Sequence, residues 1–194
     1  MTRWPTRAAM QERILATADR LFNGEGIRGV GVDRIAAEIG ISKRTLYNYY
    51  ACKEDLVLAY LTRRHVPARC SGAPPDEQIL ALFDWMERWF GSSTFRGCPF
   101  VNAVAELGDS AARIACDFKE QRRLWLKQML VQMDVADPEL LATQIALLME
   151  GAIASALVRR DPTIAQSAKA AVDVLLKASA RGSARAPLPD DGAR

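Results

Sequence analysis

The chain has 194 residues, of which 49% are hydrophobic, and a formal net charge of +3. This length and apolar content suffice for a substantial core, so the composition excludes a disordered or low-complexity protein. Charge is unevenly distributed, because residues 1–65 hold 11 lysines and arginines against 7 acidic residues while the remainder is close to neutral. A modestly basic N-terminal third favours local docking on DNA over general coating of nucleic acid.

The sequence also narrows the compartment and the chemistry. It contains no apolar run of about 20 residues, the length that spans a bilayer, and its N-terminus lacks the apolar stretch of a signal peptide. We therefore expect a cytoplasmic protein without membrane contact. Four widely spaced cysteines form no CxxC pair and one histidine offers no metal cluster, so we expect no metal, no cofactor and no enzymatic activity.

The first predicted helix covers about residues 7–23. Its apolar residues recur on one face, and Gly24 and Gly26 follow as helix stop signals. This helix is expected to pack across the next two.

Residues 31–50 predict a helix-turn-helix. Val32, Ile35, Ala36 and Ile39 follow the i, i+3, i+4, i+7 spacing of one helical face, and Gly40 suits the left-handed position just past a helix end. Ser42 is then a candidate N-cap for the second helix. In that helix Leu46 and Tyr50 are expected to face inward.

The opposite face of the second helix carries the chemistry that a DNA duplex requires. Lysine and arginine neutralise phosphates or reach guanine, asparagine pairs with adenine, and threonine and tyrosine donate to phosphate oxygens. An ordinary helical hairpin with a solvated basic face is the alternative interpretation.

These residues also carry a resemblance to a known family. The runs Val32–Ala36, Gly40–Tyr50 and Lys53–Leu56 resemble the N-terminal domain of TetR-type (tetracycline-repressor-like) transcriptional regulators. The resemblance implies an all-helical homodimer, with a three-helix DNA-binding domain followed by a larger helical domain that binds a small molecule and dimerises. It departs at Gly31 and Cys52, where Ser or Thr often begins a helix. The DNA contacts that the resemblance implies are Val32, Lys43, Arg44, Thr45, Tyr47, Asn48, Tyr49 and Lys53.

The domain organisation follows from the resemblance and from turn-forming residues. We place the DNA-binding domain at residues 1–52 and the ligand-binding and dimerisation domain at 53–180. The fourth helix, 53–65, is expected to link them, and a loop rich in Pro, Gly and Ser follows it. Residues 181–194 are expected to form a disordered tail.

The sequence predicts a helix over residues 76–90 that is apolar over a wide arc, a short helix from Pro99, and a long helix to about Asp134 with one apolar and one charged side. Their aromatic and methionine side chains are candidates for a ligand pocket, although residues at this spacing often pack simply as core. The tentative pocket residues are Trp85, Trp89, Phe100, Val104, Phe118, Trp125, Met129 and Gln144.

Cys98 precedes Pro99 at the expected start of a helix, where the helix dipole favours a thiolate. Sensing of oxidants or electrophiles by Cys52 or Cys98 is therefore an alternative to ligand binding, although an idle thiol is the simpler interpretation.

The last two predicted helices begin with the matching pairs Asp137–Pro138 and Asp161–Pro162, each an acidic N-cap before a first-turn proline. The first of them is apolar almost all round, so another surface must cover it. We expect both helices to pair with their copies in a homodimer. Glu150 lies in this apolar stretch, and either a partner subunit or a ligand could satisfy it.

The sequence thus favours a ligand-responsive homodimeric repressor that binds a palindromic operator as double-stranded DNA and is released by a small apolar or aromatic effector. An enzyme is the rival from another class, but the chain has no glycine-rich phosphate loop and no HExxH motif. An activator or a nucleoid-type DNA binder is the third possibility.

Overall fold

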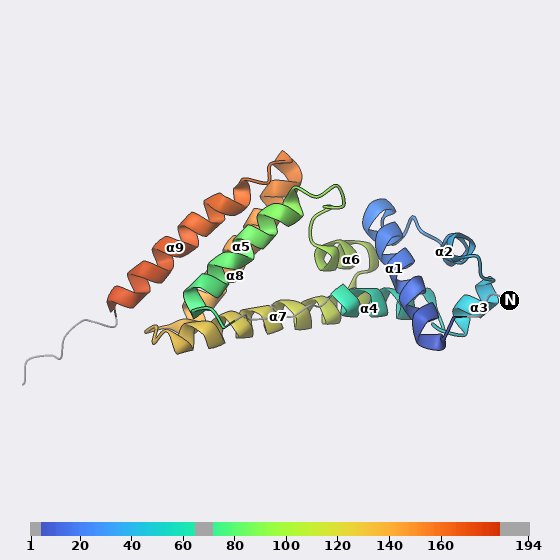
Figure 1. The fold of residues 1–194 in the computed structure, drawn as a ribbon, viewed down its shortest axis with the longest axis horizontal. Coiled ribbons are helices and arrows are strands. Elements are labelled where there is room, and N and C mark those ends of the chain that lie inside the picture. The colour runs from blue at the N-terminus through green and yellow to red at the C-terminus, as the bar shows by residue number, and fades with distance from the viewer. Residues whose placement is uncertain (1–4, 65–71, 183–194) are drawn as a thin grey trace, which may run out of the picture. The chain divides into compact units, whose positions relative to one another are not determined.

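The computed structural model describes residues 5–64 and 72–182, and within these ranges the chain forms helices and no strand. The predicted fold class, an all-helical chain in which a helix-turn-helix domain precedes a further helical domain, is confirmed. The predicted tail lies outside the described residues from position 183 onward. The helices in chain order are α1 Arg7–Glu25, α2 Val32–Ile39, α3 Lys43–Tyr47, α4 Lys53–Arg64, α5 Pro75–Phe90, α6 Pro99–Leu107, α7 Asp109–Gln132, α8 Pro138–Arg159 and α9 Ile164–Gly182 (Figure 1).

The helices pack into two compact units. The first comprises residues 1–69 and 92–120, and the second comprises residues 70–91 and 121–194. The division falls inside α7, so the first unit joins α1–α4 with α6 and the start of α7. The boundaries predicted at residues 52 and 180 separate parts of the chain by expected function, whereas the two units are defined by packing. The functional boundaries therefore stay a prediction.

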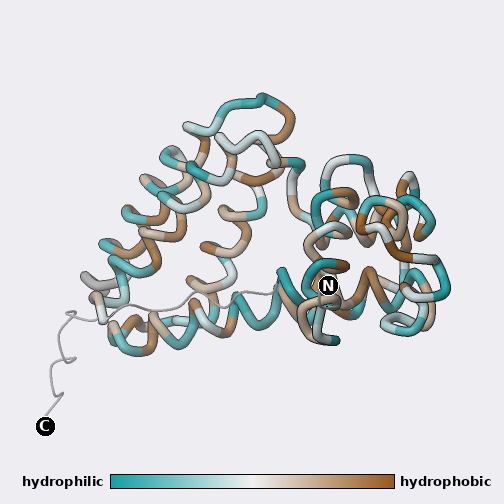
Figure 2. Tube along the Cα trace, turned by 45° about the vertical axis from the view of Figure 1, so that its right-hand side comes forward, coloured by the Kyte–Doolittle hydropathy of each residue, from teal (hydrophilic) through white to brown (hydrophobic). Residues whose placement is uncertain are grey.

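The first unit is built around α1. Thr6 caps this helix by accepting a hydrogen bond from Ala9 N at 3.2 Å. Its apolar face packs against α2 and α4. Gly24, a predicted stop, lies inside the helix, and the chain leaves at Gly26 with a φ of 82°. The alternation of hydrophilic and hydrophobic residues along the helices follows this packing (Figure 2). The buried residues of α1 are Met10, Ile14, Ala18, Leu21 and Phe22.

The turn between α2 and α3 has the predicted chemistry. Gly40 is left-handed, with a φ of 78° and a ψ of 34°. The Ile41 N–H then reaches back to the Ala36 carbonyl at 3.0 Å, which satisfies one of the free carbonyls at the end of α2. Ser42 caps α3 by accepting from Thr45 N at 3.0 Å.

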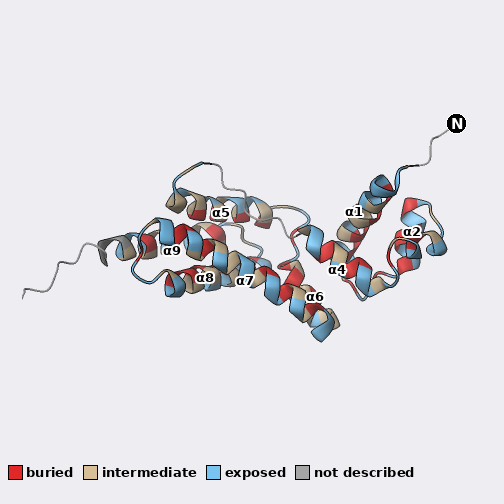
Figure 3. Cartoon of the chain, turned by 90° about the horizontal axis from the view of Figure 1, so that it is seen from below, coloured by how far each residue is buried: buried red, intermediate tan, exposed pale blue. Residues whose placement is uncertain are grey.

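In the second unit, α5, α8 and α9 pack side by side (Figure 1). An ion pair ties α9 to α5, since Lys169 Nζ lies 2.6 Å from Asp84 Oδ1. This hydrogen bond lowers the pKa of Asp84. Buried and exposed positions alternate along α8 and α9, so each helix keeps one face uncovered within the chain (Figure 3).

The expectation about apolar runs was wrong for α8. This 22-residue helix is long and apolar enough to cross a membrane by length and composition, with 39% of its most apolar window buried. Core helices of water-soluble proteins pass the same test, because a helix covered by protein needs no polar face. The sequence estimate missed α8 because isolated polar residues, among them Glu150, interrupt the run.

The two matching Asp-Pro pairs behave differently. Asp137 caps α8 as predicted, accepting from Leu140 N at 2.9 Å. The Asp161 carboxylate instead accepts from the Thr163 N–H at 2.9 Å, two residues on, which is an Asx turn. As a result α9 begins at Ile164 and not at the proline.

We predict opposite effects of alanine at two glycines. Both Gly40 and Gly24 have open space where a Cβ would lie, but only Gly40 has a positive φ. Gly40→Ala should lower the free energy of unfolding by about 1–2 kcal/mol through backbone strain. Gly24→Ala should raise it by about 0.5–1 kcal/mol through helix propensity. Urea unfolding of the full chain measures both, and shifts of the same sign would contradict the assigned turn.

Candidate DNA-binding surface

The helix α3 is held by its inner face. Leu46 is completely buried, and Tyr50 is buried just beyond the helix end, as predicted. The helix is shorter than expected, because it ends at Tyr47 and not at Tyr50. Its last turn tightens there, since the Leu46 carbonyl accepts from both Tyr49 N at 2.9 Å and Tyr50 N at 3.2 Å.

The opposite side of α3 is open. Lys43, Arg44, Tyr47 and Asn48 are exposed, with Tyr47 at 38% of its full accessibility. Two guanidinium or ammonium groups, an amide and a phenol thus lie at one surface, which is the donor set that phosphates and base edges accept from. The structure brings these four predicted residues together, and their role as DNA contacts stays a prediction.

Lys43 has a partner that the sequence pattern did not indicate. Its Nζ lies 2.9 Å from Asp33 Oδ2 on α2, and this hydrogen bond raises the pKa of Lys43. A phosphate that binds Lys43 has to compete with the Asp33 carboxylate, so Asp33 belongs to the candidate surface as an opposing charge.

Thr45 and Tyr49 are half-buried at the edge of this surface. The Thr45 hydroxyl lies 2.8 Å from the Ser42 hydroxyl, so both belong to the cap of α3. The Tyr49 ring faces the Arg7 guanidinium, 5.0 Å from its centroid. Both residues can contact a phosphate only with the polar tip of the side chain.

Two predicted contacts lie apart from the exposed set. Val32 is buried in the core, so its side chain does not face solvent, and only its backbone remains available for the predicted contact. Lys53 is half-buried at the start of α4. Its pKa is lowered there, because the effect of burial exceeds the opposing effect of the nearby Glu106 carboxylate. Its ammonium group is therefore less available than that of Lys43.

The departure at Cys52 is tolerated by the fold. The Asp55 N–H donates to Cys52 Sγ at 3.4 Å, so the thiol occupies the place of a capping hydroxyl. Cys98 is buried at the start of α6, with Lys119 Nζ 3.5 Å from its sulfur. Among the described residues, no group of three or more His, Cys, Asp and Glu side chains is placed to hold a metal ion.

The tentative ligand-pocket residues divide between the two units. In the first unit, Phe100 and Phe118 stack with ring centroids 3.9 Å apart. Val104 belongs to this unit and is half-buried. Both phenylalanines are buried, so their stacking also fits a packed core.

In the second unit, Trp85 and Trp89 stack with their centroids 5.3 Å apart. Trp85 is 48% exposed, whereas a side chain in the wall of a closed pocket would be buried. Met129 is buried and Trp125 is half-buried. The role of the whole set in ligand binding stays a prediction.

Gln144, the last member of that set, lines a different feature. An apolar groove of about 600 Å³ runs between α8 and α9, and Gln144, Leu148, Gly151 and Leu175 are among the residues that line it. Its position on the uncovered faces of these helices matches the surface that the sequence assigned to dimerisation.

The comparisons with known proteins agree with this geometry. Residues 14–60 match the family model described as bacterial regulatory proteins, tetR family. A solved TetR-family transcriptional regulator from Streptomyces coelicolor is 31% identical, with a TM-score of 0.78, over 88% of this chain and 95% of its own. A TetR transcriptional regulator from Streptomyces avermitilis is 30% identical, with a TM-score of 0.75, over 87% of this chain and 97% of its own.

An HTH-type transcriptional regulator from Staphylococcus aureus is 38% identical over 53 residues. That match covers 27% of this chain and 29% of the relative, so it spans less than a third of the curated proteins it resembles. Each of these relatives is named as a transcriptional regulator, and no family of enzymes is indicated.

The geometry of α3 predicts the effect of three substitutions on DNA affinity. Lys43→Ala and Tyr47→Ala should each weaken binding to a duplex selected by the wild-type chain by about 1–3 kcal/mol. Asp33→Asn should strengthen binding to random duplexes, because it removes the carboxylate that competes for Lys43. Fluorescence anisotropy at several salt concentrations measures all three.

Lys177→Ala on α9 is the matched control, because it removes the same charge from an exposed lysine in the second unit. If it weakens binding as much as Lys43→Ala does, the assigned surface is wrong.

Proposed function

Because this chain belongs to the TetR family of transcriptional regulators, we propose that it is a ligand-responsive homodimeric repressor that binds a palindromic operator. The observation that carries this proposal is the outer side of α3, which exposes polar side chains while Leu46 on its inner side is buried. The left-handed Gly40 and the Ser42 cap that precede α3 are typical of a helix-turn-helix. The protein acts in the cytoplasm, where its DNA target lies.

Each subunit inserts α3 into one major groove of the operator. Arg44 and Asn48 supply the side chains that discriminate guanine and adenine, while Lys43 and Tyr47 hold phosphates. Two copies related by a twofold axis require half-sites separated by roughly 34–36 Å or a multiple of it. The operator is therefore a palindrome whose spacing is set by the dimer.

The dimer forms through the uncovered faces of α8 and α9. Leu147 lines the groove and is 66% exposed, and Val174 on α9 is also exposed. Exposed aliphatic side chains on two adjacent helices are unfavourable in water. The same surface on a second copy of the chain would bury them. A four-helix interface of this kind also accounts for the apolar character of α8.

A small apolar or aromatic effector releases the DNA. The candidate pocket residues are aromatic, methionine or amide side chains, a composition that suits a ligand with large apolar area and few polar atoms. To weaken operator binding a hundredfold, the effector has to favour the released form by about 2.7 kcal/mol.

The thiol-sensing alternative has one supporting contact, the Lys119 ammonium beside the sulfur of Cys98. The burial of Cys98, however, restricts access by oxidants. Cys52 is exposed, yet its sulfur already accepts a backbone hydrogen bond. We therefore rank effector binding first.

Selection of duplexes from a random-sequence library by the purified full chain tests the proposal. A palindromic consensus that is bound by two chains, and whose affinity exceeds that for random DNA by about a thousandfold or more, is expected. Affinity without sequence preference at all salt concentrations would replace the repressor with a general DNA binder.

The dimer surface gives a further prediction. Leu147→Glu places a charge on an already exposed position, so it should leave the monomer folded while breaking the dimer and with it high-affinity operator binding. Val131→Glu is the matched control, because Val131 on α7 is 56% exposed and does not line the groove. Light scattering after gel filtration measures the mass. An intact Leu147→Glu dimer would exclude this surface.

A further inference from the structure

The recognition helix α3 contributes little to holding itself in place. It has five residues, and Leu46 is its buried member. A helix of this length is not stable by itself, and N–H groups of residues 48–50, past its end, satisfy its last carbonyls. Contacts with neighbouring segments therefore set its orientation, and two arginines of α1 supply such contacts from outside the helix-turn-helix.

The first outside contact comes from Arg7 at the start of α1. Its Nη2 donates to the Asn48 carbonyl at 3.3 Å, just past the end of α3. The same guanidinium lies over the Tyr49 ring, 5.0 Å from the centroid. One side chain thus satisfies a carbonyl at the end of α3 and fixes the aromatic ring that follows it.

The second contact comes from Arg13, which serves α2 in the same way. Its Nη2 donates to the carbonyl of Ile39, the last residue of α2, at 3.2 Å. A guanidinium at a helix C-terminus is favoured by the helix dipole as well as by the hydrogen bond. Both helices of the motif therefore end against an arginine of α1.

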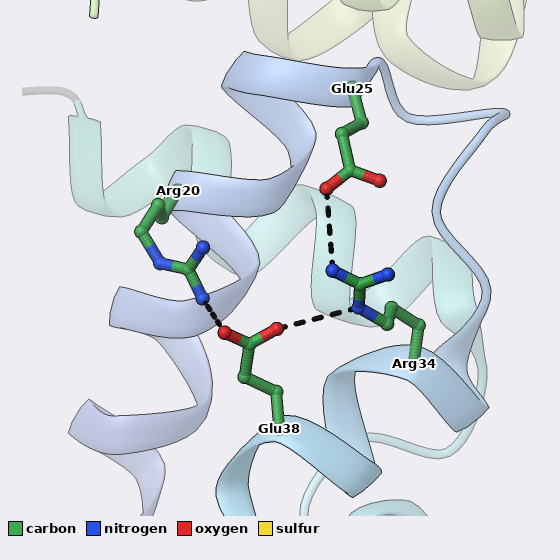
Figure 4. Close-up of polar contacts among 4 residues, drawn as sticks. All are labelled: Arg20, Glu25, Arg34 and Glu38. Carbon is green, nitrogen blue, oxygen red and sulfur yellow. Dashed lines mark hydrogen bonds and ion pairs between the residues drawn. The ribbon is translucent and has the colours of Figure 1, made fainter.

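A third arginine of α1 completes the series. Arg20 pairs with Glu38 on α2 (Figure 4). The Glu38 carboxylate also accepts from Arg34 Nε at 3.4 Å. Arg34 in turn lies 3.7 Å from Glu25 of α1. We call Arg7, Arg13 and Arg20 the arginine ladder. Two acidic residues of α1 have a different partner, because Glu12 and Asp19 pair with Arg63 of α4.

We propose that Arg7 and Arg13 are positioning residues for DNA recognition, which hold α3 and the Asn48–Tyr49 turn at the angle that the major groove requires. This inference rests on the proposed DNA-binding function. It differs from a direct phosphate contact, the other role that an arginine beside a DNA-binding surface can have. A binding site works only if its groups are held close to the productive geometry, so loss of the ladder should reduce sequence recognition more than general DNA affinity.

The test compares Arg7→Ala, Arg7→Lys, Arg13→Ala and Arg13→Lys in the full chain. The probes are a duplex that the wild-type chain selects from a random library and a random duplex of equal length. Arg28→Ala is the matched control, since it removes the same charge from an exposed side chain of the same unit.

Relative to that control, each alanine variant should lose about tenfold in affinity for the selected duplex and keep its affinity for the random one. The slope of log affinity against log salt should match the control. Arg7→Lys should stay weak, because an ammonium cannot lie over Tyr49 and donate to the Asn48 carbonyl as the planar guanidinium does. Arg13→Lys should also stay weak, because the compact ammonium does not reproduce the fixed donor geometry that reaches the Ile39 carbonyl.

Two results would overturn the proposal. If the salt slope falls by about 1 relative to the control and lysine restores binding, the arginines are phosphate contacts. If the alanine variants match Arg28→Ala on both probes, Arg7 and Arg13 have no role in recognition.

A wild-type chain that selects no duplex would instead overturn the proposed function, and the inference with it. Both arginines are exposed, so their replacement removes no core contact, and circular dichroism melting confirms that each variant is folded.

Discussion

The burial of one face of α1 against α2 and α4 is the interaction on which the first unit depends. Ile14, Ala18 and Leu21 are almost inaccessible to solvent there. Neither α2, with eight residues, nor α3, with five, buries enough apolar surface to fold alone. The helix-turn-helix therefore exists as a structured motif because a longer helix provides its core, and α1 is as much a part of the DNA-binding machinery as the helix that faces the groove.

Charge is arranged around this core so that α3 stays available. The arginine side chains of α1 bind carbonyls and carboxylates at the ends of α2 and α3, while the carboxylates of Glu12 and Asp19 pair with α4. Most of these pairs are solvent-exposed, so each contributes little to stability. What they provide is orientation, because several directional contacts converge on helices too short to fix their own angle. The outer face of α3 remains exposed, with the Lys43–Asp33 pair at its edge.

Much of the fold could be predicted because its determinants are local. Gly40 ends α2, Ser42 caps α3 and Leu46 faces inward. Each role depends on residues a few positions away in the sequence, so residue type and spacing predict it. The Lys43–Asp33 pair and the arginine ladder join residues on different helices, so no periodicity reveals them. The end of α3 at Tyr47 and the Asx turn at Asp161 were missed because alternative hydrogen bonds, not residue type, decide them. The candidate pocket residues belong to two different units. The spacing of apolar residues predicts which side of a helix is buried but not which unit the helix joins.

The uncovered groove on α8 and α9 has a consequence for how the regulator responds to its own abundance. If a second copy fills it, as proposed, the species that reads a palindrome forms in proportion to the square of the free subunit concentration. Operator occupancy then rises steeply over a narrow range of copy number and not gradually. A gene under such control would be switched by modest changes in the synthesis or degradation of this chain, even when the effector concentration is constant.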